Sequence, residues 1–330
     1  MRIVVDAFGG DNAPLEIIKG AALAQKEYGA DIILTGDENI IRKCMADNGI
    51  QFSNVEIVHT SDVISMHDEP TSLIKEHRES SMAVAFNILN EGEADAFVSA
   101  GSTGAVVVGG TLLIKRIKGV KRPALGTMLP SPDKSYMLLD MGANADCRPE
   151  MLRQFGIMAS VYLEKVEGRK NPTIGLLNIG AEDTKGDELH KEAYKLLDSA
   201  PINFIGNVEA REMPKGVCDG IVTDGCSGNI ALKVVEGTAS TMFKMLKGVF
   251  YKNLLTKAAA AILKKSLYEI KGKMDPSEVG GVPLLGVKKP VIKAHGSSDA
   301  QAVKNAIKQA ITFTQNDVIA TIAENLCQEE

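Results

Sequence analysis

The sequence predicts an α/β protein in which a mostly parallel β-sheet lies between two layers of helices, a three-layer α/β/α arrangement. The main observation is a recurring segment: a short run of Val, Ile and Leu ends in a loop rich in Gly, Ser, Asn or Asp, and a helical pattern then begins. Strands that alternate with helices in this way pair in parallel through right-handed crossovers. A second observation is that no Pro-, Ser- or Gly-rich linker divides the 330 residues. We therefore expect residues 1–330 to form one large α/β domain, either undivided or in two lobes.

Six segments of the chain carry this pattern of strand, loop and helix. The predicted strands and the loops that follow them are 2–5 with 6–14, 96–99 with 100–104, 137–139 with 140–144, 174–177 with 178–186, 221–223 with 224–229, and 291–293 with 294–299. In an open parallel sheet, loops at the carboxyl ends of the strands converge on one crevice. We therefore expect the six loops to lie along one edge of the sheet, although glycine also ends strands that bind no ligand.

Capping residues and periodicity support the predicted helices. Pro14 follows Asn12 closely, as expected of a first-turn proline near a capping side chain. Near the C-terminal end, apolar residues recur at spacings of three and four, which predicts an amphipathic helix containing Ala302, Val303, Ala306, Ile307, Ala310 and Ile311.

Composition excludes several classes of protein. Hydrophobic residues at 45% and charged residues at 24% are ordinary globular values, so the chain is neither disordered nor fibrous. The net charge is −5, and nine Phe, six Tyr and no Trp make aromatic residues scarce, so we expect no nucleic-acid partner. No run of about 18 apolar residues could span a membrane, and the first residues are typical of a core strand and not of a signal peptide. The five cysteines are odd in number and lack CxxC spacing, which favours a reduced cytoplasmic setting without structural zinc.

The loop 100–104 is the best candidate for binding phosphate. It offers closely spaced backbone N–H groups and two hydroxyls directly before a helix. The familiar phosphate-binding patterns are absent, because no GxGxxG follows a strand and the glycines of 281–286 are followed by Val287-Lys288 and not by Lys and Ser or Thr. A Rossmann dehydrogenase and a Walker ATPase are therefore both disfavoured.

Nucleophile and metal patterns are weak. Cys226 lies in a loop before a helix, where a thiolate is favoured, but no His is related to it in sequence as a base. Ser227 lacks the final glycine of a GxSxG elbow. The segment 67–70 (His-Asp-Glu-Pro) suggests a metal cluster, yet no second His–carboxylate group accompanies it, so a loop before a helix is the better interpretation. His295 differs because it lies in one of the six loops, where it could contact a ligand.

Residues 240–273 form a basic segment in an acidic chain. Eight lysines and one glutamate give it a net charge of +7, and the rest of the chain then carries −12. Apolar residues alternate with the lysines at helical spacing, with a break near 252–253, which predicts a basic amphipathic helical hairpin. The hairpin is either a pair of core helices with a solvated lysine face or a protruding element that contacts an anionic membrane or an acidic protein. The residues expected at such a contact are Lys247, Phe250, Leu254, Leu255, Lys257, Ile262 and Lys264.

Taken together, the motifs resemble those of the PlsX family of phosphate acyltransferases. The resemblance runs in order from the first residues to about residue 313 and rests on the segments 6–11 with Ala13-Pro14, 67–70, 99–105, 139–144, 178–180, 184–186, Asp224-Gly225 with Gly228-Asn229, and 295–298.

The resemblance implies an activity, a fold and partners. It implies transfer of a fatty acyl group from acyl carrier protein to inorganic phosphate, which yields acyl phosphate for phospholipid synthesis. It also implies a homodimer whose fold is similar to phosphotransacetylases and to isocitrate and isopropylmalate dehydrogenases. Members of the family are cytoplasmic and associate peripherally with the membrane, where a glycerol-3-phosphate acyltransferase that consumes acyl phosphate is a further expected partner. The resemblance assigns catalysis to Lys185 and Asn229.

This chemistry requires no cofactor, because phosphate near neutral pH is already an anionic nucleophile. The protein must supply anion binding, alignment and stabilisation of the developing oxyanion, without an acyl-enzyme or a metal ion. The residues that we expect to bind phosphate or substrate are Asp6, Gly9, Gly10, Ser99, Gly101, Ser102, Thr103, Gly104, Asn144, Asn178, Asp224, His295 and Ser297. Two other functions remain open: a nicotinamide-dependent decarboxylating dehydrogenase of the same fold, and a non-catalytic adaptor for membrane or carrier protein.

Overall fold

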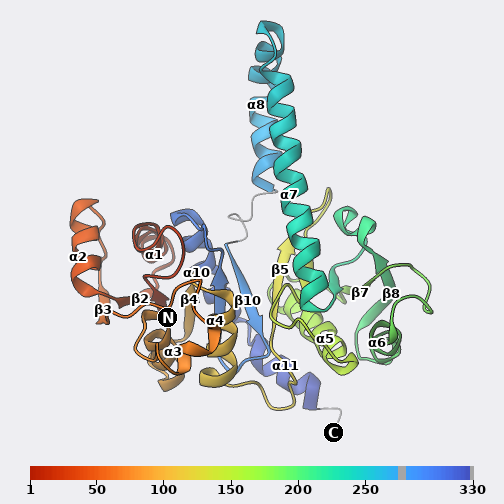
Figure 1. Ribbon diagram of the computed structural model, residues 1–330, viewed down its shortest axis with the longest axis horizontal. Coiled ribbons are helices and arrows are strands. Elements are labelled where there is room, and N and C mark those ends of the chain that lie inside the picture. Colours follow the sequence, from red (N-terminus) through yellow and green to blue (C-terminus); the bar gives the residue numbers. More distant parts are fainter. Residues whose placement is uncertain (274–279, 328–330) are drawn as a thin grey trace.

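The computed structural model of the chain describes residues 1–273 and 280–327. These residues form an 11-stranded sheet in the order β3-β2-β1-β4-β11-β10-β5-β6-β9-β7-β8 (Figure 1). The first half of the sheet consists of β3 (Val55–His59), β2 (Asp31–Gly36), β1 (Arg2–Asp6), β4 (Ala96–Ser99), β11 (Val291–Ala294) and β10 (Gly281–Leu285). The second half consists of β5 (Ala124–Leu129), β6 (Tyr136–Leu139), β9 (Gly220–Val222), β7 (Thr173–Asn178) and β8 (Asn203–Glu209).

The sheet is mostly parallel, as predicted. Antiparallel pairing is confined to its centre, where β10 is antiparallel to both β11 and β5, and β5 is antiparallel to β6. The remaining neighbours pair in parallel. As a result, β1, β4 and β11 in the first half end at the same edge, as β6, β9 and β7 do in the second.

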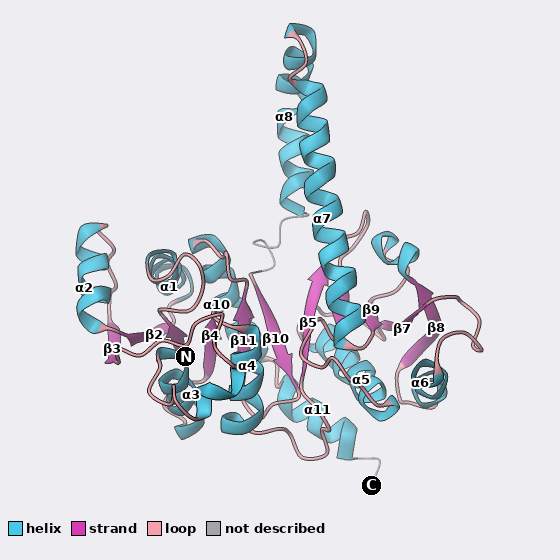
Figure 2. Ribbon diagram, in the orientation of Figure 1, coloured by secondary structure: helices cyan, strands magenta, loops and turns pink. Residues whose placement is uncertain are grey.

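Helices cover both faces of the sheet (Figure 2). They are α1 (Leu15–Tyr28), α2 (Glu38–Asp47), α3 (Ser81–Glu91), α4 (Thr103–Gly109), α5 (Pro149–Lys165), α6 (Glu188–Asp198), α10 (Ala300–Gln315) and α11 (Val318–Cys327), with the short helices η1 (Pro70–Ile74), η2 (Gly110–Ile114) and η3 (Ala210–Lys215). The alternation of side chains along β1 explains why helices form a layer on each face of the sheet. Ile3 and Val5 pack into a buried cluster with residues of α1 and α10, whereas Val4 packs into another cluster with residues of α3 and α4. Successive side chains of a strand point to opposite faces, so both faces of β1 are buried.

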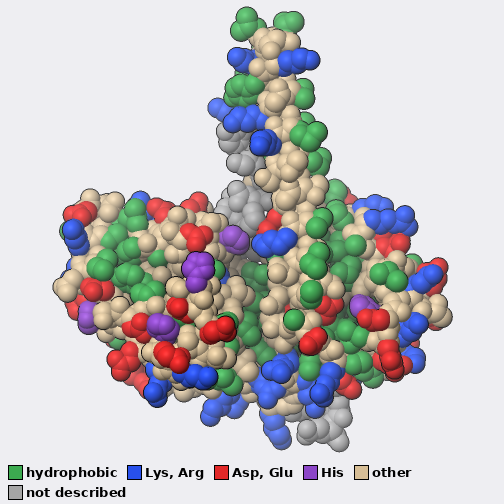
Figure 3. All heavy atoms as spheres, viewed as in Figure 1, with side chains coloured by type: hydrophobic (Ala, Val, Ile, Leu, Met, Phe, Trp, Pro, Cys, Tyr) green, Lys and Arg blue, Asp and Glu red, His purple; other side chains and the backbone are tan. Residues whose placement is uncertain are grey.

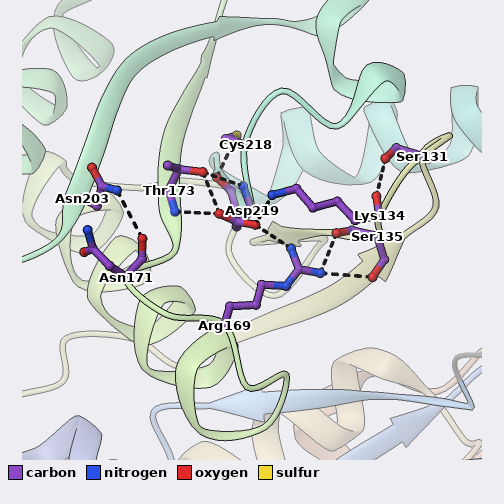
Figure 4. A network of polar contacts seen from close by, with 10 residues as sticks. Ser131, Lys134, Ser135, Arg169, Asn171, Thr173, Asn203, Cys218 and Asp219 are labelled. Atoms are coloured by element: carbon purple, nitrogen blue, oxygen red, sulfur yellow. Dashed lines mark hydrogen bonds and ion pairs between the residues drawn. The ribbon is translucent and has the colours of Figure 1, made fainter.

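An ion-pair network connects the amino-terminal ends of β6, β9 and β7 in the second half of the sheet (Figure 4). The Asp219 carboxylate, next to β9, lies 2.9 Å from Arg169 Nη1 and 2.5 Å from Lys134 Nζ. It also accepts hydrogen bonds from the backbone N–H and the hydroxyl of Thr173, the first residue of β7, both at 2.8 Å. Burial by itself raises the pKa of Asp219, but these hydrogen bonds outweigh it and hold the pKa well below its ordinary value. The network lies at the opposite ends of the strands from the loops expected to bind substrate.

Two long helices project from the body of the molecule (Figures 1 and 2). α7 (Gly225–Phe250) and α8 (Leu254–Lys273) run side by side, and the chain turns between them at 251–253. The Asn253 side chain accepts a hydrogen bond from Thr256 N–H at 2.9 Å, which caps the start of α8. α7 begins 15 residues before the expected start at 240, because the Asp224 carboxylate caps it by accepting from Ser227 N–H at 2.8 Å. Among the described helices, none is both long and apolar enough to cross a membrane.

Candidate active site

A cleft of about 440 Å³ opens at the base of α7, between the two halves of the sheet. Figure 3 shows a hollow at this place, with histidine and basic side chains at its edge. The first half of the sheet contributes the polar residues Asp11, Thr103, Lys293 and His295. The second half and α7 contribute most of its apolar surface, namely Met128, Leu129, Pro130, Met141, Leu232, Val235 and Ala239. Asn229, Lys233 and Glu236 of α7 also line it. The side formed by the first half of the sheet, here called the polar side, therefore faces a mostly apolar side on which α7 also places three polar residues.

Asp6 organises the loops beneath the polar side. Its carboxylate accepts hydrogen bonds from the hydroxyls of Ser81 at 2.6 Å and Ser99 at 2.7 Å. Burial raises the pKa of Asp6, and these two hydrogen bonds oppose the rise. A Cβ on Gly9 would lie 2.5 Å from Asp6 Oδ2, so the loop can approach this closely only because residue 9 is glycine. Asp6, Gly9 and Ser99 thus come together as expected, but they do not line the cleft.

The loop 100–104 reaches the cleft through one residue, Thr103. The backbone N–H of Gly101 donates to Ser99 Oγ at 3.0 Å and is therefore already used. The Ser102 hydroxyl accepts from Ala105 N–H at 3.5 Å, as a helix cap. Gly104 packs on η1, where a Cβ would lie 2.6 Å from Pro70 Cγ. Gly101 N–H and the Ser102 hydroxyl oxygen, two of the groups that the sequence suggested for phosphate, thus support the loop itself.

The loop after β11 forms the rim beside Thr103. The backbone N–H of Asp11 donates to the Gly296 carbonyl at 2.7 Å, which joins this loop to the one after β1. Gly10, with φ of +100°, completes the junction, because a Cβ there would lie 2.9 Å from the Gly296 oxygen. His295 Nδ1 lies 2.8 Å from Ser297 Oγ and accepts from Ser297 N–H at 3.2 Å, so the neutral ring carries its proton on Nε2. Desolvation, and then the positive charge of Lys233, lower the pKa of His295 and favour this neutral form.

Lys293 is the residue that the sequence analysis missed. The sequence predicts only that it ends a strand, yet it lies in the sheet with only 6% of its surface exposed and lines the cleft. Its Nζ donates to the carbonyls of Ala100, at 3.3 Å, and Ala294. Burial lowers the pKa of Lys293 to about 8, against the opposing charges of Asp11 and Asp6. A lysine inside a run of Val, Ile and Ala was the signal that could have found it.

On the other side of the cleft, Asp140 and Asn144 hold the start of α7. The Asp140 carboxylate accepts from the backbone N–H of Leu125 at 3.0 Å and of Asn144 at 2.7 Å, while burial raises its pKa. The Asn144 carbonyl in turn accepts from Gly225 N–H at 2.7 Å. A Cβ on Gly228 would lie 1.9 Å from the Asp140 carbonyl oxygen, so α7 can pack this closely only on glycine. Asn144 and Asp224 thus position α7 and are not among the residues that line the cleft.

The two residues assigned to catalysis occupy different settings. Asn229, in the first turns of α7, is exposed and lines the cleft. Lys185 is exposed on the loop after β7 and is not among the cleft-lining residues. Asn178 stabilises that loop, because its amide donates to the Lys185 carbonyl and to Asn207 Oδ1, both at 3.1 Å. The structure therefore brings Asn229, but not Lys185, together with Thr103, Lys293 and His295.

Neither the candidate nucleophile Cys226 nor the segment 67–70, considered for a metal, lies among the polar residues of the first half that line the cleft. Cys226 is exposed on the first turn of α7. Near the 67–70 segment, His77 Nδ1 lies 3.0 Å from Asp62, and its Nε2 lies 3.7 Å from Asp68. In the described ranges, no group of three or more His, Cys, Asp or Glu side chains is arranged to hold a metal ion.

Comparison with known proteins identifies the family. The family described as "Fatty acid synthesis protein" matches residues 1–321. The chain belongs to this family. A curated relative, "Phosphate acyltransferase" from Oceanobacillus iheyensis, is 49% identical over 323 residues, which cover 98% of this chain and 96% of the relative. As a member of the fatty acid synthesis protein family with such relatives, the chain is an acyltransferase enzyme.

Solved structures confirm the expected likeness of fold to phosphotransacetylases. "EutD phosphotransacetylase from Staphylococcus aureus" superposes with a TM-score of 0.62 at 17% identity, covering 96% of this chain and 94% of that one. A putative 4-hydroxythreonine-4-phosphate dehydrogenase from Salmonella typhimurium gives a TM-score of 0.52 at 13% identity, covering 94% and 98%. This member of the fatty acid synthesis protein family therefore shares its fold with a phosphotransacetylase and with a dehydrogenase.

Proposed function

We propose that this acyltransferase moves a fatty acyl group from the thioester of acyl carrier protein to inorganic phosphate and releases acyl phosphate for phospholipid synthesis. The observation that carries the proposal is the cleft, whose polar side suits an anion and whose apolar side suits an acyl chain. Relatives named phosphate acyltransferase support the same acceptor.

The reaction needs one nucleophilic step. A phosphate oxygen attacks the thioester carbonyl carbon, the carbonyl oxygen becomes an oxyanion, and its collapse expels the carrier thiolate, which takes up a proton. The protein contributes by holding the two reactants together and by stabilising the oxyanion. We assign the amide donor to Asn229, which lines the cleft, and a cationic role to Lys185. Among the described residues, Lys185 has no ion-pair partner that would neutralise it.

The proposed direct attack predicts a strict requirement for phosphate. With acyl carrier protein thioester as donor, we expect release of free thiol only when phosphate is present, and a product that reacts with hydroxylamine. A thiol assay with and without phosphate measures the first, and hydroxamate formation the second. Thiol release at the same rate without phosphate would show a thioesterase and contradict the proposal.

We further propose that the α7–α8 pair contacts an anionic membrane through its tip. Leu254 and Leu255, at the tip, are 85% and 83% exposed, so they are not core residues of the chain. Ile262, further along α8, is 83% exposed. Figure 3 shows hydrophobic side chains at the tip and basic side chains just below them, an order that suits apolar insertion between anionic head groups. Such contact would be peripheral and would place the enzyme beside a membrane enzyme that consumes acyl phosphate. An acidic carrier protein is the alternative partner of the same surface.

We also propose that the enzyme is a homodimer and that the outer face of α7 forms part of the interface. Apolar residues that are 58–69% exposed follow this face at helical spacing: Ile230, Val234, Met242, Met245 and Val249. Figure 3 shows hydrophobic side chains along the same helix. An exposed apolar stripe of this kind is typical of an interaction surface, and a second copy of the chain brings an identical stripe.

A further inference from the structure

The polar side of the cleft contains a buried ammonium group, that of Lys293, which forms no ion pair with a carboxylate of the described residues. Lys293 belongs to β11, where it pairs in register with Ser99 of β4 and Val282 of β10. Its Nζ donates to two backbone carbonyls, which leaves one of its three N–H donors without an acceptor among the described residues. Within residues 1–273 and 280–327, no carboxylate oxygen forms an ion pair with this group at 4.0 Å or less.

A buried ammonium group destabilises the folded protein unless an opposite charge or hydrogen bonds compensate its loss of hydration. A buried charge is normally paired with an opposite charge or hydrogen-bonded on all sides. The Asp6 carboxylate cannot fully compensate the charge of Lys293, because its oxygens already accept hydrogen bonds from the hydroxyls of Ser81 and Ser99. The remaining N–H of Lys293 borders the cleft, where a ligand can reach it.

We propose that Lys293 binds the inorganic phosphate that attacks the thioester, through a charge-assisted hydrogen bond from Nζ to a phosphate oxygen. This inference rests on the proposed function, because it names the residue that holds the acceptor. Thr103 and the Nε2–H of His295 border the same side of the cleft and provide further donors. Lys293 thus orients the nucleophile, whereas Asn229, on α7, serves the oxyanion.

The division of the cleft favours phosphate over the thioester oxygen as the partner of Lys293. The acyl chain requires the apolar side, formed by Leu232, Val235 and Ala239 of α7 and by the end of β5. Lys293 lies on the side formed by the first half of the sheet, and a small dianion is the reactant that gains most from a poorly solvated cation. The thioester carbon is then reached by the phosphate from the Lys293 side.

The groups around Lys293 make phosphate affinity depend on pH. Asp6 faces it from the end of β1 and Asp11 from the loop that follows. His295 follows it on the rim, and Lys233 and Glu236 face the rim from α7. Because the pKa of His295 is lowered, its titration lies below that of Lys293. Lys293, with a pKa of about 8, is charged at neutral pH and loses its charge as the pH rises. Phosphate affinity should therefore fall between about pH 7 and pH 9.

The test measures phosphate binding to the full-length protein by calorimetry, together with the KM for phosphate and for acyl carrier protein thioester. We expect Lys293→Met to weaken phosphate binding and raise the phosphate KM by roughly 10- to 100-fold, the scale for a hydrogen bond to a charged group. The thioester KM should change little. Lys293→Arg should retain part of the affinity and lose the fall between pH 7 and pH 9. Lys288→Met, which removes an exposed lysine from the turn before β11, is the matched control and should behave as the wild type.

Three results would overturn the inference. These are unchanged phosphate binding by folded Lys293→Met, a loss of kcat with both KM values intact, and wild-type phosphate affinity that does not vary from pH 7 to pH 9. The last measurement requires no variant, so it applies even if Lys293→Met does not fold. Calorimetry follows phosphate without the acyl donor, so a failure of the proposed reaction and a failure of the Lys293 assignment remain distinguishable.

Discussion

Two buried aspartates position the residues of the cleft. Asp6 ends β1 and Asp140 follows β6, and burial raises the pKa of both carboxyl groups. Each accepts several hydrogen bonds from its own loop and from its neighbours. The loops that contain them pack on glycine, at Gly9 in one case and at Gly228 in the other. These contacts hold Thr103 and Asn229 at the two sides of the cleft, whereas Asp6 and Asp140 themselves do not line it.

At the residue scale we predict that Asn229→Ala lowers kcat by roughly 100-fold or more, the scale for losing one transition-state donor. We expect a similar loss for Lys185→Ala. Both side chains are exposed, so the free energy of unfolding should change little. Steady-state kinetics and thermal unfolding measure the two effects.

Cys226→Ser is the matched control for Asn229→Ala, because it changes an exposed side chain three residues earlier in the same helix. Most activity should remain, since direct attack by phosphate uses no thiolate. An inactive but folded Cys226→Ser enzyme would favour an acyl-cysteine intermediate instead. Full activity of both Asn229→Ala and Lys185→Ala would remove these two residues from the mechanism.

At the scale of the element, the α7–α8 pair separates membrane contact from catalysis. Its tip lies far from the cleft, which is at the other end of α7 (Figure 1). α7 contributes to both places, because Leu232 and Val235 line the cleft near its start and Phe250 ends it at the tip. One helix therefore connects the site of chemistry with the proposed site of membrane contact.

The tip can be tested by replacing Leu254 and Leu255 together with Glu. We expect release from anionic vesicles, because burial of two leucines, worth about 1.5–3 kcal/mol each, is lost and two negative charges are added beside an anionic surface. Vesicle flotation measures binding, and turnover with acyl carrier protein thioester in solution should persist. Salt should weaken wild-type binding as well, since lysine attraction is screened beyond about 8 Å at physiological ionic strength.

A suitable control replaces Leu23 and Ile40, two exposed apolar residues of the body, with Glu. This control should bind vesicles as the wild type does. If the tip variant still binds vesicles but no longer binds carrier protein, the α7–α8 pair serves the acyl donor and the membrane proposal is wrong.

At the scale of the whole molecule, the exposed apolar stripe of α7 predicts self-association. Met245→Glu places a charge on the stripe, where Met245 is 69% exposed, and should convert a dimer to a monomer. Sedimentation velocity measures the change. Lys247→Glu, on the opposite face of the same helix, should leave the dimer intact. A wild-type protein that sediments as a monomer at micromolar concentration would contradict the proposal.

Much of the sheet could be predicted from local sequence. Runs such as 2–5 and 96–99 are apolar, end in short polar residues and precede helices, so their parallel pairing follows from local pattern and chain connectivity. The central strand β10 could not be predicted in this way. Its residues 281–285 contain a glycine and a proline. They become a strand only by pairing antiparallel to β11, the next strand in the chain, and to β5, which comes from a distant part of the sequence.

For the candidate site, the sequence by itself determined which chemical groups gather at the strand ends, because residue types and strand ends are local properties. Tertiary structure decided which of these groups are free. Gly101 N–H and the Asp6 oxygens are engaged by neighbours, whereas Asn229 borders the cleft. Tertiary structure also decided the charge and burial of Lys293, since a lysine at the end of an apolar run becomes a buried cation only when β4 and β10 flank it. The physical reason is that hydrogen-bond saturation and desolvation depend on neighbours brought together from distant parts of the chain.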